Sequence, residues 1–247
     1  MNIIQKIDRF YFFLVFIYQV IKPLFRFQID LKRFFDELYF LGVRSILVLS
    51  LTLFFVGMAF TFQILQEFIK FGATKLMGGV VALAMVRELS PLLLGVVASG
   101  RISASIAAEI GSMKVSEQID ALKAMGKQPA SFLISPKLAA LLFMMPLLVM
   151  LGHLVGFLGG LIIVMSTPRV NTVSYFTSAQ MMLETSDFTV SLIKAAVFAF
   201  FIVILSSFCG FSCNQGAQSV GQKTTLAVVL SLLAVFISNF FLSSLLF

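Results

Sequence analysis

Residues 138–165 read LAALLFMMPLLVMLGHLVGFLGGLIIVM, a run of 28 residues that contains no aspartate, glutamate, lysine or arginine. About 20 predominantly apolar residues in a helix are enough to cross the hydrocarbon core of a bilayer, so this run predicts a membrane span. The whole chain has the same character, because 60% of its 247 residues are hydrophobic and only 12% are charged. Soluble domains carry about 25% charged residues. A bilayer is therefore the expected solvent.

Four further apolar runs are near or above the length that a crossing needs. They cover residues 43–65, 76–100, 188–212 and 224–247. Together with 138–165 they predict an all-α polytopic membrane protein with five transmembrane helices. A single membrane domain over residues 43–247 accounts for all five spans.

The N-terminal region, residues 1–42, contains an apolar stretch at 10–21 that is too short to cross a bilayer. Arg9, Lys22 and Pro23 flank this stretch. A short apolar helix with basic ends is typical of the membrane interface, so we expect an N-terminal interfacial helix. No A-x-A-like cleavage site follows, and no cleaved signal peptide is predicted.

The distribution of lysine and arginine predicts which loops share a side of the membrane. Residues 1–44, 101–137 and 213–223 hold thirteen of these basic residues, whereas 66–75 and 166–187 hold three. The side that faces the cytoplasm, or its equivalent, carries the excess. The N-terminus and the 101–137 segment are therefore expected on this inner side, and the C-terminus on the other. The same bias explains the net charge of +7 without a nucleic-acid partner.

Two charged residues, Arg87 and Glu88, lie near the middle of the second predicted span. A charge at this depth costs roughly 2.5–3.5 kcal/mol on insertion scales, so each side chain needs a partner. Neighbouring residues on a helix point about 100° apart, so the two cannot simply pair with each other. Pro91 removes a backbone donor nearby and can loosen the helix. Two interpretations stay open: a polar lining of a transport cavity, or an interhelical ion pair that fixes packing.

Other conspicuous residues predict packing rather than chemistry. One face of the third span carries glycine at every fourth position, which lets another helix approach closely. These residues are Gly152, Gly156 and Gly160. His153 is the only histidine, and Cys209 and Cys213 lie one helical turn apart with no further cysteine. We therefore predict no catalytic residues and no metal site.

Residues 111–136 read GSMKVSEQIDALKAMGKQPASFLISP and contain a predicted short amphipathic helix on the inner side. Its apolar residues recur at helical spacing, at Val115, Ile119, Leu122 and Met125. Its charged residues lie on other faces, at Glu117, Asp120 and Lys123. Gly126 suits the position just past its end, and Pro129 prevents continuation. Such a helix can lie on lipid headgroups or dock a soluble partner, and its composition does not decide between them.

Residues 216–225, GAQSVGQKTT, are close to the phosphate-binding loop G-x-x-x-x-G-K-[ST] but do not match it. Gln222 separates Gly221 from Lys223, and the flanking segments are predicted spans rather than a preceding β-strand. We therefore expect no cofactor on this chain. If transport is active, ATP is used by another polypeptide.

Residues 87–129, RELSPLLLGVVASGRISASIAAEIGSMKVSEQIDALKAMGKQP, resemble the signature of MlaE-type permeases of ABC transporters. The resemblance extends from about residue 34 to the C-terminus, and includes 135–146 and 216–238. The C-terminal part is most similar to the cyanobacterial and plastid branch of the family, which includes the chloroplast inner-envelope lipid permease. Ser90 and Ser103 stand where the family usually has glycine.

The resemblance implies partners, cargo and location. It implies a homodimer of permease subunits, two ATPase subunits on the inner side, a substrate-binding protein with an MCE domain on the opposite side, and a phospholipid or related polar lipid as cargo. It also implies the plastid inner envelope or a bacterial inner membrane, with the N-terminus on the ATPase side.

The resemblance also implies roles for particular residues. Arg87 and Glu88 match a charged pair close to the lipid pocket, and Arg101, Glu109 and Gly111 match a motif that leads into the inner-side coupling helix. Residues 117–126 match that helix, whose expected contacts with the ATPase are Glu117, Gln118, Asp120, Leu122, Met125 and Gly126. On this interpretation, apolar side chains near the outer ends of the first two spans are candidate acyl-chain contacts. They are Phe60, Phe68 and Phe71.

The function that fits these patterns best is a permease subunit that moves lipid, driven by a separate ATPase. One alternative is a non-transporting assembly or scaffold protein that docks a soluble partner through residues 117–126. A second alternative is an intramembrane enzyme. The sequence shows no histidine-supported nucleophile, metal cluster or pair of aspartates on facing spans that would support it.

Overall fold

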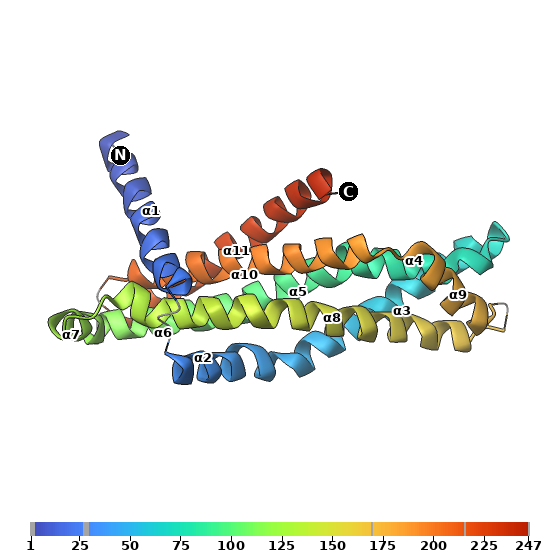
Figure 1. The fold of residues 1–247 in the computed structure, drawn as a ribbon, viewed down its shortest axis with the longest axis horizontal. Coiled ribbons are helices and arrows are strands. Elements are labelled where there is room, and N and C mark those ends of the chain that lie inside the picture. The colour runs from blue at the N-terminus through green and yellow to red at the C-terminus, as the bar shows by residue number, and fades with distance from the viewer. Residues whose placement is uncertain (1–2, 27–29, 169, 215, 247) are drawn as a thin grey trace. The chain divides into compact units, whose positions relative to one another are not determined.

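The structure is a computed structural model that describes residues 3–26, 30–168, 170–214 and 216–246, and the side chains of 3–10 are not described. Over these residues the chain forms helices joined by short turns, with no strand (Figure 1). Five helical segments are long and apolar enough to cross a membrane, and a shorter apolar helix precedes them. The predicted fold class is therefore confirmed.

The helices follow one another along the chain with only short connections. Their bounds are α1 Ile3–Phe25, α2 Leu31–Glu37, α3 Ile46–Lys70, α4 Met77–Ala84, α5 Ser90–Ala98, α6 Ala104–Val115, α7 Gln118–Ala124, α8 Ser135–Met165, α9 Thr172–Met182, α10 Thr185–Phe211 and α11 Ala217–Leu246. Short π-helical turns at Leu38–Gly42, Met85–Leu89, Ser99–Ser103 and Ala130–Ile134, and 3₁₀ turns at Val43–Ser45 and Thr74–Leu76, connect several of them.

All five observed segments are longer than the predicted spans, and the first two exceed them most. The first apolar segment is helical over Leu31–Lys70, and the second over Thr74–Val115. The second therefore continues as α6 into the stretch that hydropathy assigns to a polar loop from residue 101. Small and apolar residues such as Ala107 and Ile110 are fully buried there, which explains why the helix persists. Phe247, the last residue of the fifth predicted span, lies outside the described residues.

The chain forms two compact units. Unit 1 comprises residues 1–43, 98–143 and 198–235, and unit 2 comprises 44–97, 144–197 and 236–247. Helices α8, α10 and α11 contribute residues to both units. The division of the chain at residues 42 and 43 into an interfacial region and a membrane domain stays a prediction.

In unit 2, helices α3 and α8 are in contact through glycine. An added Cβ at Gly57 would overlap the carbonyl of Gly156, and one at Gly156 would overlap the side chain of Met85. The buried positions of α3 recur every four residues along the same helix, at Leu49, Leu53, Gly57, Thr61 and Leu65. The predicted close approach through the glycine face of the third span is confirmed.

Helices α4 and α9 also pack closely in unit 2. A Cβ at Gly78 would overlap the backbone of Tyr175, and the amide of Gly79 donates to Ser178 Oγ at 3.0 Å. The Tyr175 ring stacks on Phe157 with 4.6 Å between centroids, and its hydroxyl donates to the Phe157 carbonyl at 3.2 Å. These contacts fix α9, which is too short to cross a bilayer, against the membrane helices.

In unit 1, helix α1 packs on the C-terminal part of α10. Phe16 makes edge-to-face contacts with Phe208 and Phe211, with centroids 5.9 and 5.7 Å apart. Ser135 Oγ donates to the carbonyl of Val20 at 2.8 Å, and Val20 is fully buried. The apolar N-terminal helix thus buries one side against protein, while residues such as Phe12 stay exposed on the other.

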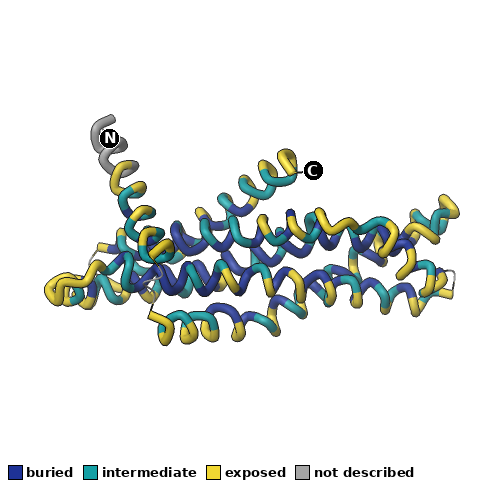
Figure 2. The backbone as a smooth tube through the Cα atoms, in the orientation of Figure 1, coloured by how far each residue is buried: buried dark blue, intermediate teal, exposed yellow. Residues whose placement is uncertain are grey.

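Figure 2 shows exposed positions along the long helices. Many of the residues at these positions are large and apolar. On α8 they include Phe143, Leu147, Leu151, Leu154, Leu158 and Ile162. Soluble monomers rarely expose apolar surface of this extent, whereas lipid tails are its natural solvent. The outward faces therefore agree with the spans that hydropathy predicts.

The contact between α3 and α8 generates the first prediction. Gly57→Ala places a methyl group against the Gly156 carbonyl, so the helices must separate, and overpacking of this kind costs about 1–3 kcal/mol. We expect a lower midpoint of thermal unfolding in detergent. Gly221→Ala is the control, because nothing lies within 4 Å of a Cβ there and alanine favours the helix. Equal midpoints for the two variants would contradict the close contact.

Candidate functional site

Arg87 and Glu88 lie in the π-helical turn Met85–Leu89, between α4 and α5. Turns of this kind widen a helix locally and are frequent at functional sites. Pro91 has no N–H and cannot donate the bond that an α-helix would give to the carbonyl of Arg87. Lys194 Nζ from α10 donates to that carbonyl instead, at 2.7 Å. Because of Pro91, the carbonyl of Arg87 can accept a hydrogen bond from a side chain of another helix.

Glu88 is the centre of a polar network that joins three helical segments of unit 2. Its Oε1 accepts from Lys194 Nζ at 2.8 Å and from Ser243 Oγ at 2.7 Å. Its Oε2 accepts from Asn239 Nδ2 at 2.9 Å. Lys194 Nζ also donates to Ser243 Oγ at 2.8 Å, so the ammonium has three acceptors for its three protons. A fully buried lysine is stable here because each of its donors is satisfied.

Arg87 makes the second ion pair, with Asp187 in the first turn of α10. Arg87 Nε lies 2.8 Å from Asp187 Oδ1. Asp187 Oδ2 accepts from the amide of Glu184 at 3.0 Å, the reach-back bond of a capping box, which also favours an acidic residue at a helix N-terminus. The aspartate therefore both caps α10 and holds the guanidinium.

The structure shows the partners of Arg87 and Glu88, which bear on both interpretations of this charged pair. Each charge pairs with α10 rather than with its neighbour, as the 100° offset requires. Asp187 and Lys194 are fully buried, whereas the side chains of Arg87 and Glu88 stay 39% and 41% exposed. The pairs fix packing, while the side chains of Arg87 and Glu88 remain partly exposed. The role of this pair in lipid binding stays a prediction.

Sequence reasoning missed four members of this site, which are Asp187, Lys194, Asn239 and Ser243. The signal that singled out Arg87 and Glu88, a charge inside an apolar span, applies equally to Lys194. Asn239 and Ser243 carry no such signal, because uncharged polar residues are common in membrane helices.

An apolar cavity of about 200 Å³ lies in unit 2 beside the charged turn. Met85 and Val86, the two residues before Arg87, line it together with residues of α8, α9 and α10. His153 is also in its wall, with its ring 5.9 Å from Phe188 and its Nε2 3.0 Å from Ser191 Oγ. Two residues of the charged turn thus line the cavity, but Arg87 and Glu88 do not, and the lining is almost purely apolar.

The three predicted acyl-chain phenylalanines do not line this cavity. Phe60 and Phe68 are half-buried and pack on a cluster of unit 2 that includes Met77, Val81 and Met85. Phe71 follows the end of α3 and is 81% exposed. Their role in binding acyl chains stays a prediction, and the structure does not gather all three in one place.

Unit 1 contains a second buried lysine, Lys137 at the start of α8. Its ammonium donates to a carboxylate oxygen of Glu37 and to both oxygens of Glu109, at 3.0 and 2.8 Å. Glu109 belongs to the motif that resembles the MlaE family. Through Lys137 it is connected to α8, which follows it in the chain, and to Glu37 of α2, which precedes it. Neighbouring positions pack as closely: Ser103 Oγ lies 2.9 Å from Ser231 Oγ, and a Cβ at Gly111 would overlap Cys213 Sγ.

The predicted coupling helix is α7, with a sharper start than its sequence indicates. Val115 ends α6, and Glu117 has φ = 59°, which breaks the helix before α7 begins. The prediction that Val115 shares an apolar face with α7 is therefore wrong. At the other end Gly126 has φ = 73°, with Gly126 N–H bonded to Lys123 O and Lys127 N–H to Leu122 O. This pair of bonds is a Schellman motif, and it confirms Gly126 as the residue just past the helix.

Most of α7 is exposed (Figure 2). Ile119 is buried and Leu122 is half-buried, but Met125 is 66% exposed, so the apolar stripe only partly faces the protein. Asp120 accepts from Lys123 at 2.7 Å and from Lys114 at 3.3 Å. These two hydrogen bonds hold the pKa of Asp120 below its ordinary value. The remaining predicted contacts, Glu117, Gln118 and Gly126, are all exposed.

Comparison with known proteins identifies a family and several relatives. The family model of the MlaE permease matches residues 34–245. A probable ABC transporter permease protein of Synechocystis sp. is 41% identical over 229 residues, 93% of this chain and 87% of the relative. Protein TRIGALACTOSYLDIACYLGLYCEROL 1, chloroplastic, of Arabidopsis thaliana is 37% identical over 93% of this chain and 65% of its own length. A probable ABC transporter permease protein of Pyropia yezoensis is 34% identical over 89% and 84%.

The five spans and these similarities define an integral membrane subunit of the ABC transporter class. The chain belongs to the MlaE permease family. Its relatives place it in a plastid or bacterial membrane.

Removing one partner of the buried pair should destabilise the protein. Lys194→Met leaves the Glu88 carboxylate without its cation, and breaking a buried pair costs roughly 3–5 kcal/mol, less here because Glu88 is partly exposed. The double variant with Glu88→Gln should recover part of this loss, because no unpaired charge remains. A double-mutant cycle on the thermal midpoint measures the coupling, and the exposed Lys75→Met serves as the control. Additive single effects would argue against a coupled pair.

The end of α7 offers a prediction about backbone conformation. Gly126→Ala forces a residue with a Cβ into a left-handed conformation, at a cost of roughly 1–2 kcal/mol, although nothing crowds that position. We expect faster hydrogen exchange of residues 118–124. Gly126→Asn should be much milder, because asparagine tolerates this conformation. Equal exchange in both variants would mean that the Schellman motif does not hold the helix.

Proposed function

We propose that this chain is the permease subunit of an ABC transporter that moves phospholipid or a related polar lipid, driven by a separate ATPase subunit. The observation that carries the proposal is the match of the MlaE permease family over residues 34–245, since it covers both the charged turn and α7. The name of the Arabidopsis relative refers to a glycerolipid, which agrees with a lipid cargo.

The charged turn and the adjoining cavity suit an amphipathic cargo. The side chains of Arg87 and Glu88 are partly exposed, so they can meet the polar part of a lipid, while their partners on α10 hold them in place. The apolar cavity lined by Met85 and Val86 can take part of an acyl chain. Its 200 Å³ is below the roughly 300–1,000 Å³ of usual ligand sites, so a whole phospholipid needs more surface. A second copy of this chain would supply that surface, and Phe60, Phe68 and Phe71 are candidates for the remaining acyl contacts.

Helix α7 suits the docking of a motor subunit. It is exposed, it is fixed at both ends by backbone geometry, and its charges are arranged by the pairs of Asp120 with Lys114 and Lys123. In this proposal ATP binds the partner subunit, which contacts residues 117–126 on the same side as the N-terminus, and this chain carries no cofactor. A substrate-binding protein with an MCE domain would act on the opposite side.

Two substitutions test these assignments in the reconstituted transporter. Glu88→Gln should reduce lipid co-purification and lipid transfer while the complex stays assembled, because it removes the carboxylate charge of the proposed cargo site but keeps an oxygen to which the buried Lys194 can donate. Asp120→Ala should cause a several-fold loss of lipid-stimulated ATPase activity or of ATPase binding, because it frees the two lysines that fix α7. Glu67→Ala is the matched control, since Glu67 is also exposed and pairs with a lysine three residues away.

The two outcomes have different meanings. Unchanged lipid transfer in both variants would overturn the assigned roles. Stable binding of a soluble partner without any lipid transfer by the parental chain would favour the scaffold alternative.

A further inference from the structure

We propose that unit 1 contains a binding site for one anionic lipid of the inner leaflet, in a cavity between α1, α7 and the C-terminal end of α10. The cavity has a volume of about 450 Å³. It is lined by other residues than the cavity beside Arg87 and Glu88, and the inference does not depend on transport.

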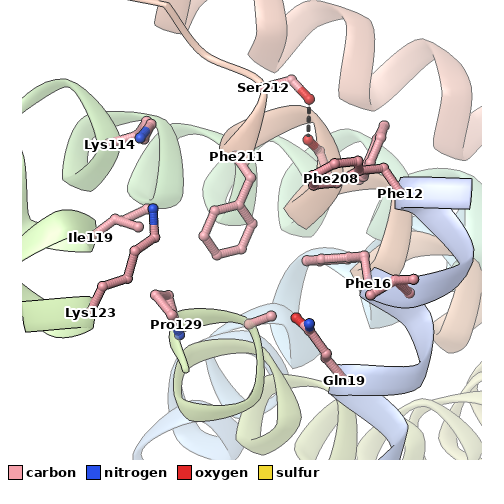
Figure 3. Close-up of a pocket in the computed structure, with 12 residues that line it drawn as sticks. Phe12, Phe16, Gln19, Lys114, Ile119, Lys123, Pro129, Phe208, Phe211 and Ser212 are labelled. Carbon is pink, nitrogen blue, oxygen red and sulfur yellow. Dashed lines mark hydrogen bonds between the residues drawn. The ribbon is translucent and has the colours of Figure 1, made fainter. Parts of the chain in front are cut away.

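The lining has an aromatic part and a cationic part (Figure 3). Phe12 and Phe16 of α1 and Phe208 of α10 lie together in the view, with Phe211 in the centre. Lys114 and Lys123 lie on the opposite side of Phe211, from α6 and α7. Aromatic and apolar walls take an acyl chain, and ammonium groups at one end take a phosphate headgroup. The cavity thus has an apolar end that suits the acyl chains of an anionic lipid and a cationic end that suits its headgroup.

The charge balance at the cationic end favours an anion. The two lysines share Asp120, whose carboxylate lies 3.3 Å from Lys114 Nζ and 2.7 Å from Lys123 Nζ. Two ammonium groups and one carboxylate leave one net positive charge. The Lys123 side chain is 57% exposed and the Lys114 side chain is 31% exposed. Both side chains are therefore accessible to a lipid headgroup.

The position along the chain places this cavity at a membrane surface. Its walls come from the apolar N-terminal helix, from α6 and α7, and from the last turn of α10. The first two lie in residues 1–44 and 101–137, which hold twelve of the 18 lysines and arginines. Phe12 is an exposed residue of the lining, as expected for a helix that borders lipid. A lipid of the adjacent leaflet is therefore the occupant whose chemistry fits both parts of the lining.

The chain contains no tryptophan, so one introduced tryptophan reports on this cavity alone. We suggest Phe211→Trp in the full chain, reconstituted in phosphatidylcholine liposomes that contain either brominated phosphatidylglycerol or brominated phosphatidylcholine at equal mole fraction. We expect an apparent preference of about fivefold for the anionic lipid, which is what one net positive charge near the headgroups gives. Phe12→Trp, at an exposed position of the same lining, gives a second reporter that does not disturb the interior.

Substitution of the lysines identifies the source of the preference. Lys114→Gln with Lys123→Gln should bring quenching by the two lipids close to equality, whereas Lys127→Gln, an exposed lysine outside the lining, should leave the preference intact. Phe55→Trp, on the exposed face of α3, sets the level of quenching by bulk lipid.

Three outcomes would overturn the proposal. Equal quenching by both lipids in the parental reporter would show that the cavity does not select anions. If the preference for the anionic lipid survives the double lysine substitution, its cause is general attraction by the basic surface and not the two lysines of the cavity. Quenching below that at residue 55 would show that no acyl chain enters the cavity and that protein covers it.

Discussion

A lysine ammonium can remain inside an apolar helix bundle only if every one of its three protons finds an acceptor, and Lys194 meets this condition with the Arg87 carbonyl, Glu88 and Ser243. Much of unit 2 follows from this requirement. The Arg87 carbonyl is available to a side chain because Pro91 cannot donate to it, and the wider π-helical turn lets Arg87 and Glu88 both reach α10. The C-terminal part of α11 is drawn to the same point by Asn239 and Ser243.

Polar contacts have this weight because lipid tails give apolar helices little reason to prefer each other over lipid. Close packing and hydrogen bonds must then select the partners. The structure uses both devices: glycine permits backbone contact where α3 meets α8, and buried lysines join helices where side chains are longer. Lys137 with Glu37 and Glu109 repeats in unit 1 what Lys194 does in unit 2.

Hydropathy was enough to predict five spans, and the spacing of glycines was enough to predict close packing at Gly156. The end of α7 at Gly126 followed from the preference of glycine for the position just past a helix and from Pro129. Hydropathy could not predict that α6 continues to Val115, because small residues there are buried by tertiary packing rather than by their own hydrophobicity. A charge inside a span shows that a partner is needed, but not which helix provides it. Hence Glu88 was recognisable from the sequence, whereas its contacts with Asn239 and Ser243 were not.

The partners in these networks are far apart along the chain. Glu88 and Lys194 are separated by 106 residues, and Arg87 and Asp187 by 100. At about 5–20 residues per second, a ribosome needs roughly 5–20 s to synthesise the intervening chain. During that interval the second span carries a carboxylate and a guanidinium that have no counter-ion from α10. The two ion pairs can therefore form only after α10 has been synthesised, and the network around Glu88 is complete only when Asn239 and Ser243 of α11 follow.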